Sequence, residues 1–435
     1  MLKRKVSKLL EQWVSHKHKK CLIVQGARQT GKTFAIERFA EEKYEETVEI
    51  NFKQTPSAAE VFSGDLTVEN MVMALRFRFP DKKIVPGKTL IFLDEIQECE
   101  EAITSLKFWA TDDEFDVIAS GSLLGIDYKR ASSYPVGYVD YIKMYGLDFE
   151  EFLWGMGVPE DIIGSLRGYV SEKKEIPKAI HTQLMGYYRL YIATGGMPEA
   201  VQKYLDTKDF REVDAVQRSL LMGYQYDIAH YAVAEEKVKA EKCYLTLAKQ
   251  LLDKENHKFQ YKEIERGARG QKYYSSIDWL LKADMVHLCK IVSAVKYDLD
   301  DYARDDFFRA YTTDLSLLIA MKDFSLKQHI VENTLVGNTK GGLYECAIAD
   351  ALYKKGYRLY FYKNETAKRE LDFVIQVDGN VVPIEVKSGN FRANSLSAVM
   401  KKNPDISYAY KFADGNIGVS DEGIITLPLY MAAFL

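Results

Sequence analysis

The chain has 435 residues, enough for about three domains at roughly 150 residues each. Hydrophobic residues make up 47% and charged residues 28%, as in ordinary globular proteins, and the net charge of −4 argues against a generally basic nucleic-acid binder. The five cysteines form no Cys-x-x-Cys pair, which argues against a zinc site or a disulfide framework. No apolar run approaches the roughly 18 residues that span a bilayer, so we expect a cytoplasmic protein without a membrane partner.

In the first 147 residues, short apolar runs alternate with helical stretches. The runs cover residues 21–25, 47–51, 89–94 and 115–120. Nearly continuous apolar strands separated by helices are typical of a parallel sheet that is covered on both faces. We therefore predict an α/β domain at residues 1–147.

The segment after the first run fits the phosphate-binding loop pattern G-x-x-x-x-G-K-[ST]. It follows a predicted strand and opens a predicted helix, the context that supports such a match. Backbone N–H groups of such a loop wrap phosphates, and the helix N-terminus adds a positive dipole end. We expect ATP as the ligand, with Lys32 on its β- and γ-phosphates and Thr33 on Mg²⁺. The candidate nucleotide-binding residues are Gly26, Ala27, Arg28, Gln29, Thr30, Gly31, Lys32, Thr33 and Phe34.

The run at 89–94 ends in two carboxylates, Asp94 and Glu95. Asp94, at the strand's carboxyl end, is expected beside the loop, where it would hold Mg²⁺. Glu95 is placed to orient or deprotonate the attacking water, which makes it a candidate catalytic residue together with Lys32. At the end of the next run, Ser120 or Ser122 is a candidate sensor of the γ-phosphate, although serines there also cap helices.

The middle of the chain reads as a lid in two parts. Residues 148–235 are mostly helical, and residues 236–325 have the outline of a winged helix, with helices at 242–252, 259–268 and 273–286 and a strand at 287–292. Basic residues near its recognition helix favour phosphate contact, but interleaved acidic residues favour a plain lid, and both interpretations stay open. The basic residues are Lys262, Arg266, Arg269 and Lys272.

The last domain, at residues 326–435, carries a predicted hairpin. Two strand-like runs flank Asp378-Gly379, a strong two-residue turn. This turn places Asp372 opposite Glu385 and Glu370 opposite Lys387 on one face, while the other face is wholly apolar. One interpretation is an amphipathic hairpin with a wet polar face. The other starts from the repulsion between opposed carboxylates, which Mg²⁺ would turn into a gain.

Several stretches together resemble one family. They are QGARQTGKT, TLIFLDEIQ, ASGSLLG, TGGMPEAV, RELDFVIQ and VVPIEVKSG. The chain resembles the AAA+ and STAND-like ATPases, and in particular the bacterial AAA-type ATPases that carry a C-terminal domain of unknown function with a restriction-endonuclease-like core. The resemblance implies an α/β fold with a parallel-sheet P-loop ATPase core, a helical and winged-helix lid, and a C-terminal nuclease-like α/β domain.

The resemblance also implies roles for individual residues. Gly196-Met197-Pro198 matches a Gly-x-Pro signature, in which Pro198 would contact the nucleotide. Tyr138 stands where the resembled family has an arginine, so no arginine finger is assigned.

In the C-terminal domain the order Glu, Asp, Glu-x-Lys resembles the PD-(D/E)XK nucleases. There Glu345, Asp372 and Glu385 would bind Mg²⁺, and Lys387 would be catalytic.

Two functional hypotheses follow. In the first, ATP binding or hydrolysis controls a metal-dependent nuclease-like domain that acts on DNA or another nucleic acid. In the second, the protein is a nucleotide-dependent regulatory switch whose nuclease-like domain is inactive and binds a protein or DNA partner. The sequence gives no indication of an oligomer.

Overall fold

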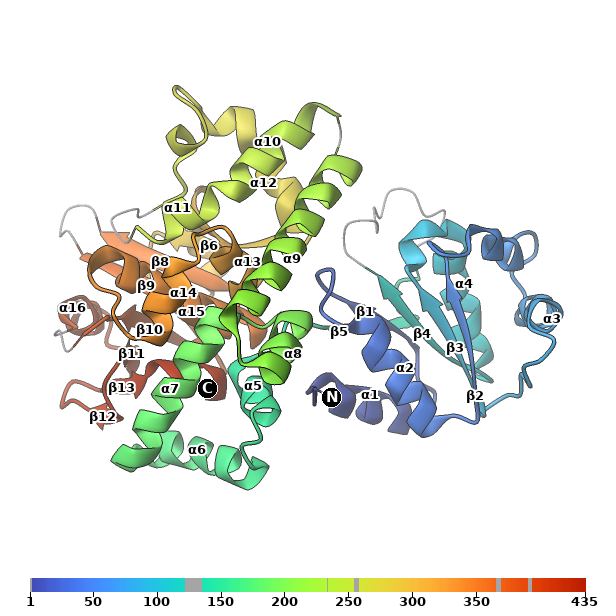
Figure 1. The fold of residues 1–435 in the computed structure, drawn as a ribbon, viewed down its shortest axis with the longest axis horizontal. Helices are drawn as coiled ribbons and strands as arrows, with labels where there is room; N and C mark the ends of the chain where they lie inside the picture. The colour runs from blue at the N-terminus through green and yellow to red at the C-terminus, as the bar shows by residue number, and fades with distance from the viewer. Residues whose placement is uncertain (1, 122–134, 233, 254–257, 365–368, 390–392) are drawn as a thin grey trace. The chain divides into compact units, whose positions relative to one another are not determined.

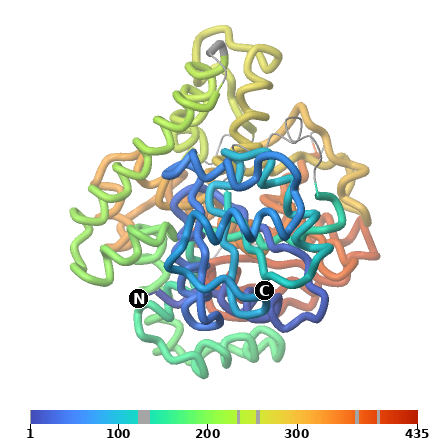
Figure 2. The backbone as a smooth tube through the Cα atoms, turned by 90° about the vertical axis from the view of Figure 1, so that its right-hand side faces the viewer, coloured from blue at the N-terminus to red at the C-terminus, as the bar shows by residue number. Residues whose placement is uncertain are grey.

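The computed structural model of the chain describes residues 2–121, 135–232, 234–253, 258–364, 369–389 and 393–435. Contacts divide them into two compact units (Figures 1 and 2). The N-terminal unit consists of residues 4–145 together with the short segment 282–284. The C-terminal unit consists of residues 1–3, 146–281 and 285–435.

The N-terminal unit is built around a five-stranded sheet in the order β2-β3-β4-β1-β5, with every neighbouring pair parallel. The strands are β1 (Cys21–Gln25), β2 (Glu46–Asn51), β3 (Thr89–Asp94), β4 (Asp116–Gly121) and β5 (Val139–Lys143). The helices are α1 (Val6–Ser15), α2 (Lys32–Lys43), α3 (Val68–Arg78) and α4 (Glu100–Asp112). The parallel sheet and its first four strands are confirmed.

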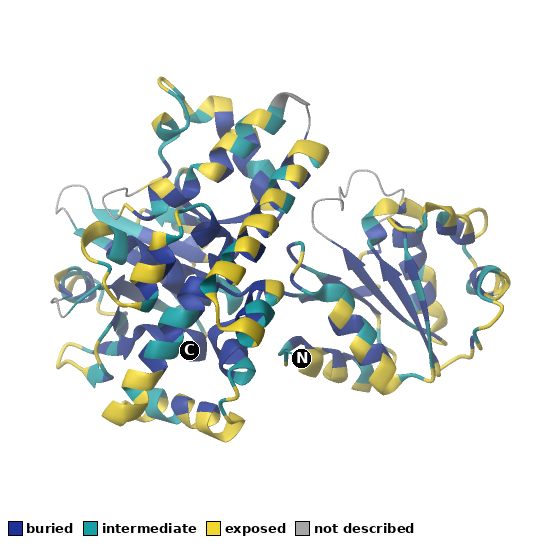
Figure 3. Cartoon of the chain, in the orientation of Figure 1, coloured by how far each residue is buried: buried dark blue, intermediate teal, exposed yellow. Residues whose placement is uncertain are grey.

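Both faces of this sheet are covered, as the dark blue strands of Figure 3 show. Alternate residues of β3 enter different cores: Ile91 and Leu93 pack with α3 and α4, while Leu90 and Phe92 pack with α1 and α2. A strand buried on both faces needs apolar residues at successive positions, which is why these runs are easy to recognise. The edge strand β5 has only two buried residues, and its weaker pattern was missed.

The C-terminal unit begins with a helical part. Its helices are α5 (Phe149–Gly155), α6 (Glu160–Glu172), α7 (Lys178–Thr194), α8 (Pro198–Thr207), α9 (Phe210–Tyr231), α10 (Ala234–Leu245), α11 (Leu247–Leu251) and α12 (Gly270–Lys282). Helices α10 to α12, yellow-green to yellow in both views, lie together at one end of this unit (Figures 1 and 2). The mostly helical character of residues 148–235 is confirmed.

The rest of the unit is a mixed eight-stranded sheet in the order β12-β13-β11-β10-β9-β8-β6-β7. Its strands are β6 (Val286–Val292), β7 (Ala303–Thr312), β8 (Leu359–Asn364), β9 (Arg369–Val377), β10 (Asn380–Val386), β11 (Ala409–Ala413), β12 (Gly418–Val419) and β13 (Ile424–Pro428). The remaining helices are α13 (Leu315–Ala320), α14 (Ser325–Val331), α15 (Gly337–Lys354) and α16 (Asn394–Lys402). Helix α16 packs on β9 and β10, and α15 contacts β7, β8 and β10.

This sheet contains strands from both sides of the boundary predicted between residues 325 and 326. Strand β6 pairs in parallel with β8, with Cys289 beside Leu359, and so joins the predicted winged-helix segment to the last domain. The lid and the C-terminal domain therefore lie in one compact unit. A boundary drawn from helix and strand patterns does not detect such pairing, because strand partners distant in sequence leave no local signal.

The helix predicted at residues 259–268 is also absent, since this stretch contains only a 3₁₀ turn at Tyr261–Glu263. Its backbone bonds elsewhere: Phe259 N–H donates to Phe308 O at 2.7 Å, and Gln260 N–H donates to Gln250 Oε1 at 2.6 Å. Tertiary partners thus satisfy amides that would otherwise favour a helix.

Candidate functional site

The phosphate-binding loop links β1 to α2 in the N-terminal unit. Gly31 precedes the helix in a left-handed conformation (φ 86°), and Gly26 has a φ of 157°. An added Cβ on Gly26 would lie 2.0 Å from Met144 O, so only glycine fits there. Inside the loop, Thr30 Oγ1 donates to Ala27 O at 2.9 Å. The sequence pattern is therefore matched by a tight loop whose next residue, Lys32, begins a helix.

Lys32 is folded back onto its own loop. Its Nζ donates to Gly26 O at 3.0 Å and to Ala27 O at 2.9 Å. Burial lowers the pKa of Lys32, and the nearby carboxylates, first of all Glu95 and then Asp94, partly oppose that decrease. Among the described residues the Lys32 ammonium donates to carbonyl oxygens, so it gains by contact with phosphate, which offers full negative charge.

Asp94, at the carboxyl end of β3, is the centre of a polar cluster. Its carboxylate accepts from Thr33 Oγ1 at 3.2 and 3.3 Å, from Asn51 Nδ2 at 2.8 Å and from Ser120 Oγ. The predicted pairing of Thr33 with Asp94 is thus present, and Ser120 points to Asp94. Hydroxyl and carboxylate oxygens are the ligands that Mg²⁺ takes, so the residues fit that ion.

Two further carboxylates lie near Asp94. Burial raises the pKa of Glu37, with Asp94 and Glu41 adding to the increase. Burial also raises the pKa of Glu49, with Glu37 and Asp94 adding to it. A divalent cation at Asp94 would relieve this mutual repulsion.

Glu95 follows Asp94 in a left-handed conformation (φ 52°), which is uncommon for a residue with a side chain. It is partly exposed, and its carboxylate accepts from Gln97 Nε2. The turn directs Glu95 away from the line of β3 and leaves its carboxylate accessible, as a base for an attacking water requires.

Three polar residues that support this site were not predicted. Asn51 holds Asp94 and Gln97 holds Glu95, while Arg4 donates to Thr30 O at 3.0 Å and to Tyr145 O at 2.6 Å. Asn51 ends the run at 47–51 as Asp94 ends the run at 89–94, but their meeting depends on β2 lying beside β3. Arg4 lies outside any motif, and no local signal marks it.

The other predicted nucleotide-binding residues lie in different parts of the chain. Arg28 and Gln29 lie in the loop, the latter with a φ of 63°. Phe34, in the first turn of α2, is 53% exposed. Ser122 lies outside the described residues, and Pro198 begins α8 in the C-terminal unit.

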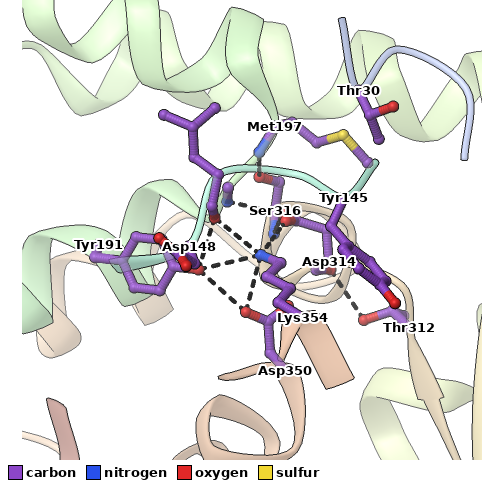
Figure 4. A network of polar contacts seen from close by, with 12 residues as sticks. Thr30, Tyr145, Asp148, Tyr191, Met197, Thr312, Asp314, Ser316, Asp350 and Lys354 are labelled. Carbon is purple, nitrogen blue, oxygen red and sulfur yellow. Dashed lines mark hydrogen bonds and ion pairs between the residues drawn. The ribbon is translucent and has the colours of Figure 1, made fainter. Parts of the chain in front are cut away.

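The Gly-x-Pro segment is bound by polar groups of its own unit (Figure 4). Gly196 N–H donates to Asp314 Oδ1 at 2.9 Å, and Met197 N–H donates to Ser316 Oγ at 3.2 Å. Asp314 precedes α13 and also accepts from Ser316 N–H at 2.8 Å. Asp314 thus caps α13, and the same carboxylate holds the Gly-x-Pro backbone.

Asp314 is part of a buried charge cluster that reaches α15. Lys354 Nζ lies 2.6 Å from Asp314 Oδ2 and 2.9 Å from Asp350 Oδ2, and it donates to Leu147 O and to Tyr191 Oη, both at 3.1 Å. The Lys354 side chain is 1% exposed. This cluster joins three segments of the unit: the Gly-x-Pro region, α13 and α15.

The pKa values in this cluster follow from burial and charge. Burial opposes ionisation of Asp314, but the Lys354 ammonium outweighs it and lowers the pKa of Asp314. Burial raises the pKa of Asp350 to about 7, against the opposing effect of Lys354. Burial alone would lower the pKa of Lys354, but the two carboxylates raise it above the ordinary value.

The C-terminal hairpin has the predicted register. Val377 pairs with Asn380 and Phe373 with Ile384, so Asp372 and Glu385 are the next opposed residues. The face that carries them is not wet: Asp372 is 8% and Glu385 4% exposed. Against β8, Asp372 and Phe373 of β9 stand opposite the single residue Phe361, so β9 carries a bulge there.

Near the hairpin end, Lys387 Nζ lies 2.5 Å from Glu385 Oε1, and Val386 N–H donates to Asp372 Oδ2 at 2.7 Å. Burial raises the pKa of Glu385, and Lys387 partly opposes the increase. Glu385 Oε2 is buried without a hydrogen-bond partner among the described residues.

Glu345 does not join Asp372 and Glu385 in the expected metal cluster. Its carboxylate accepts from Arg309 Nη1 at 2.6 Å and from Tyr311 Oη at 2.8 Å. Within the described part of the chain, no group of three or more histidine, cysteine, aspartate or glutamate side chains is arranged to hold a metal ion. The residues therefore do not fit the expected three-carboxylate site, because a protein guanidinium neutralises Glu345.

Comparison with known families agrees with the N-terminal geometry. Residues 18–153 match the model of an AAA domain. This part of the chain is similar to AAA domains and carries their phosphate-binding loop. Two models described as domains of unknown function match the C-terminal unit: DUF8612 at residues 185–328 and DUF4143 at residues 340–431. The first contains β6 and β7 and the second contains β8 to β13, so the eight-stranded sheet spans both.

Solved structures with AAA-type domains are similar only at a distance. AMPPCP-bound DnaA from Aquifex aeolicus is 15% identical with a TM-score of 0.29, covering 64% of this chain and 86% of DnaA. ORC1 from Aeropyrum pernix, solved in complex with DNA, is 10% identical with a TM-score of 0.27, covering 76% and 93%. A STAND protein with a tetratricopeptide repeat sensor from Pyrococcus horikoshii is 13% identical with a TM-score of 0.26, covering 80% and 48%.

These TM-scores are too low to support an argument about this chain. No curated protein matches its sequence. Among the helices in the described ranges, none is long and apolar enough to cross a membrane.

Proposed function

We propose that the protein is a Mg²⁺-dependent, ATP-hydrolysing switch whose output is the C-terminal unit. The observation that carries this proposal is the cluster around Asp94. There Thr33 from the phosphate-binding loop, Asn51 from β2 and Ser120 from β4 meet one carboxylate, with Glu95 as the next residue. This is the arrangement that a P-loop ATPase needs at the γ-phosphate.

In the proposed mechanism, the loop amides bind the phosphates, and Lys32 moves from Gly26 O and Ala27 O onto the β- and γ-phosphates. Thr33 and Asp94 would hold Mg²⁺, which supplies charge neutralisation at the transferred phosphoryl group. Glu95, positioned by Gln97, orients the attacking water and accepts its proton. Asn51 and Ser120 keep the Asp94 carboxylate in one orientation.

The Gly-x-Pro segment is the proposed connection to the output, with Pro198 as a nucleotide contact. A ligand shifts a conformational equilibrium only through contacts that differ between the two states. Since Asp314, Ser316 and Lys354 bind this segment to α13 and α15, we infer that the C-terminal unit responds as one body. Lid and C-terminal domain would not move independently.

Substitution of Glu95 tests the switch. Glu95→Gln should lower ATP turnover at least about 100-fold and leave ATP binding intact, since the proton acceptor is lost and the loop is not. The matched control is Glu98→Gln, an exposed carboxylate three residues later. Turnover is measured by phosphate release and binding by a fluorescent ATP analogue. Wild-type turnover in Glu95→Gln would contradict the role of Glu95, and absence of ATP binding by the wild type would contradict the whole proposal.

The finer hypothesis, a metal-dependent nuclease acting on nucleic acid, has one observation in its favour. Asp372 and Glu385 lie at the same end of paired strands, with Lys387 beside them and Glu385 Oε2 without a partner in the described structure. The Arg309–Glu345 pair counts against it.

The test of the nuclease hypothesis is cleavage of branched, single-stranded and duplex DNA with Mg²⁺ or Mn²⁺, with and without ATP. Wild type is compared with Asp372→Ala and Lys387→Ala. Cleavage that both substitutions abolish would support the nuclease. Equal inactivity of all three proteins would favour a C-terminal unit that binds a protein or DNA partner.

A further inference from the structure

We call Glu345, Glu370, Asp372 and Glu385 the C-terminal carboxylate site. Arg309 bonds to two of its carboxylates, those of Glu345 and Glu370. It lies on β7, opposite Cys289 of β6. Its guanidinium stacks over the Phe361 ring at 4.6 Å, and its side chain is 5% exposed. The Phe361 ring and the carboxylates of Glu345 and Glu370 fix the guanidinium in one place.

The guanidinium contacts three residues that lie on two elements, α15 and β9. Its Nη1 donates to Glu345 Oε1 on α15 at 2.6 Å and to the backbone oxygen of Asp372 on β9 at 3.4 Å, and its Nη2 donates to Glu370 on β9. One nitrogen therefore stands between Glu345 and Asp372. A metal ion bound to Glu345 would compete with this nitrogen for the Glu345 carboxylate.

Cations of the protein pair with three of the carboxylates around this position. Arg309 pairs with Glu345 and Glu370, and Lys387 pairs with Glu385. Burial alone would lower the pKa of Arg309, but the neighbouring groups, first of all Glu345, raise it well above the ordinary value. A buried carboxylate without a compensating charge is strongly destabilising, and here arginine supplies that charge.

We propose that Arg309 is the resident cation of the C-terminal carboxylate site and that the site takes a divalent metal ion only when Arg309 is removed. This inference does not depend on the ATPase activity, because each group that it involves lies in the C-terminal unit. The hairpin has the predicted register. Glu345 is nevertheless not available as the third metal ligand, because it pairs with Arg309.

The test uses Mn²⁺ as the probe on the nucleotide-free full-length chain, with bound Mn²⁺ counted by electron paramagnetic resonance. Arg309→Met keeps the length of the side chain and removes its charge. We expect this variant to gain a Mn²⁺ site. Its Mn²⁺ affinity should be at least tenfold higher than that of any wild-type site that Asp372→Asn removes. Adding Glu345→Gln to Arg309→Met should abolish the gained site. The matched control is Arg304→Met on the same strand, whose exposed side chain pairs with Asp306.

Two results would overturn the proposal. One is a Mn²⁺ site in the wild type that Asp372→Asn removes and that binds Mn²⁺ as tightly as the site in Arg309→Met. Arg309 and the metal ion would then be present in the site together. The other is a folded Arg309→Met variant without any gained site.

If Arg309→Met melts too early for binding measurements, the melting temperatures themselves decide. The double variant Arg309→Met/Glu345→Gln should melt above Arg309→Met, because it no longer buries an unpaired carboxylate. A double variant that melts no higher would overturn the proposal.

Discussion

At the phosphate-binding loop, charged groups bond to neutral partners: Lys32 to backbone carbonyls, and Asp94 to Thr33, Asn51 and Ser120. At the carboxylates of the C-terminal unit, charged groups bond to opposite charges: Arg309 to Glu345 and Lys387 to Glu385. A charge held by dipoles still gains from a charged ligand, whereas a charge with a counter-ion must first lose it. The comparison teaches that the partner of a motif residue, and not its type, decides whether a site is open to a ligand.

The largest effect should come from Lys354 in the C-terminal unit. Lys354→Met leaves Asp314 and Asp350 buried without their cation, so the free energy of unfolding should fall by about 3–5 kcal/mol. Denaturant unfolding followed by circular dichroism measures this change. The same substitution at Lys340, also on α15 and paired with Asp414 closer to the surface, should cost less than about 1 kcal/mol. Equal losses would mean that the buried cluster contributes no more than an ordinary ion pair.

In the N-terminal unit, Gly26→Ala tests how closely the phosphate-binding loop is packed. The new Cβ would meet Met144 O, so we expect a loss of about 2–3 kcal/mol in stability and at least a tenfold loss of ATP affinity. Gly64→Ala is the control, because Gly64 shares a positive φ but has open space around it, and about 1 kcal/mol is expected. Unchanged ATP affinity in Gly26→Ala would show that the loop tolerates a side chain where the structure leaves no room.

Asp350 should give the buried cluster a pH dependence. Its pKa of about 7 in the folded state exceeds the ordinary value, so the folded protein retains a proton that the unfolded chain has released. The stability due to this group is therefore present at low pH and is lost as pH rises through about 7. Between pH 5 and 8, Asp350→Asn should gain about 2 kcal/mol relative to wild type. Parallel stability profiles of the two proteins would contradict the raised pKa.

The smallest effect is expected at Asn51, which touches Asp94 but no predicted phosphate position. Asn51→Ala should lower ATP turnover roughly fivefold to tenfold, since one neutral hydrogen bond to a carboxylate is worth about 1–1.5 kcal/mol. In a steady-state ATPase assay over a range of Mg²⁺ concentrations, the variant should need a higher Mg²⁺ concentration than the wild type to reach its half-maximal rate. A rate loss that does not depend on Mg²⁺ would place Asn51 elsewhere in the mechanism.

Local patterns predicted much of the structure. The phosphate-binding loop, the first four strands of the parallel sheet and the register of the hairpin each depend on neighbours within a few residues of one another. Thr33 and Asp94 could be placed together because the carboxyl ends of parallel strands meet at one edge of the sheet, where β1 and β3 lie on either side of β4.

What could not be predicted depends on contacts between distant segments. Glu345 bonds to Arg309, which is 36 residues away on another element. The sequence around either residue gives no indication of this contact. Pairing of β6 with β8 likewise merges two segments that have different local patterns. Asn51 and Arg4 support the nucleotide site only through the order of strands and the path of the N-terminal segment.

The short segment 282–284 belongs to the N-terminal unit, where Asp284 Oδ1 lies 2.8 Å from Lys143 Nζ. Its position in the chain has a consequence for biosynthesis. Residues 4–145 leave the ribosome early. Asp284, the acidic partner of Lys143, emerges only after most of the helices between residues 146 and 281 have been made. The ATPase domain, first in the order of synthesis, is therefore completed late, and a nascent chain halted before residue 284 would carry a phosphate-binding loop without its full set of surrounding charges.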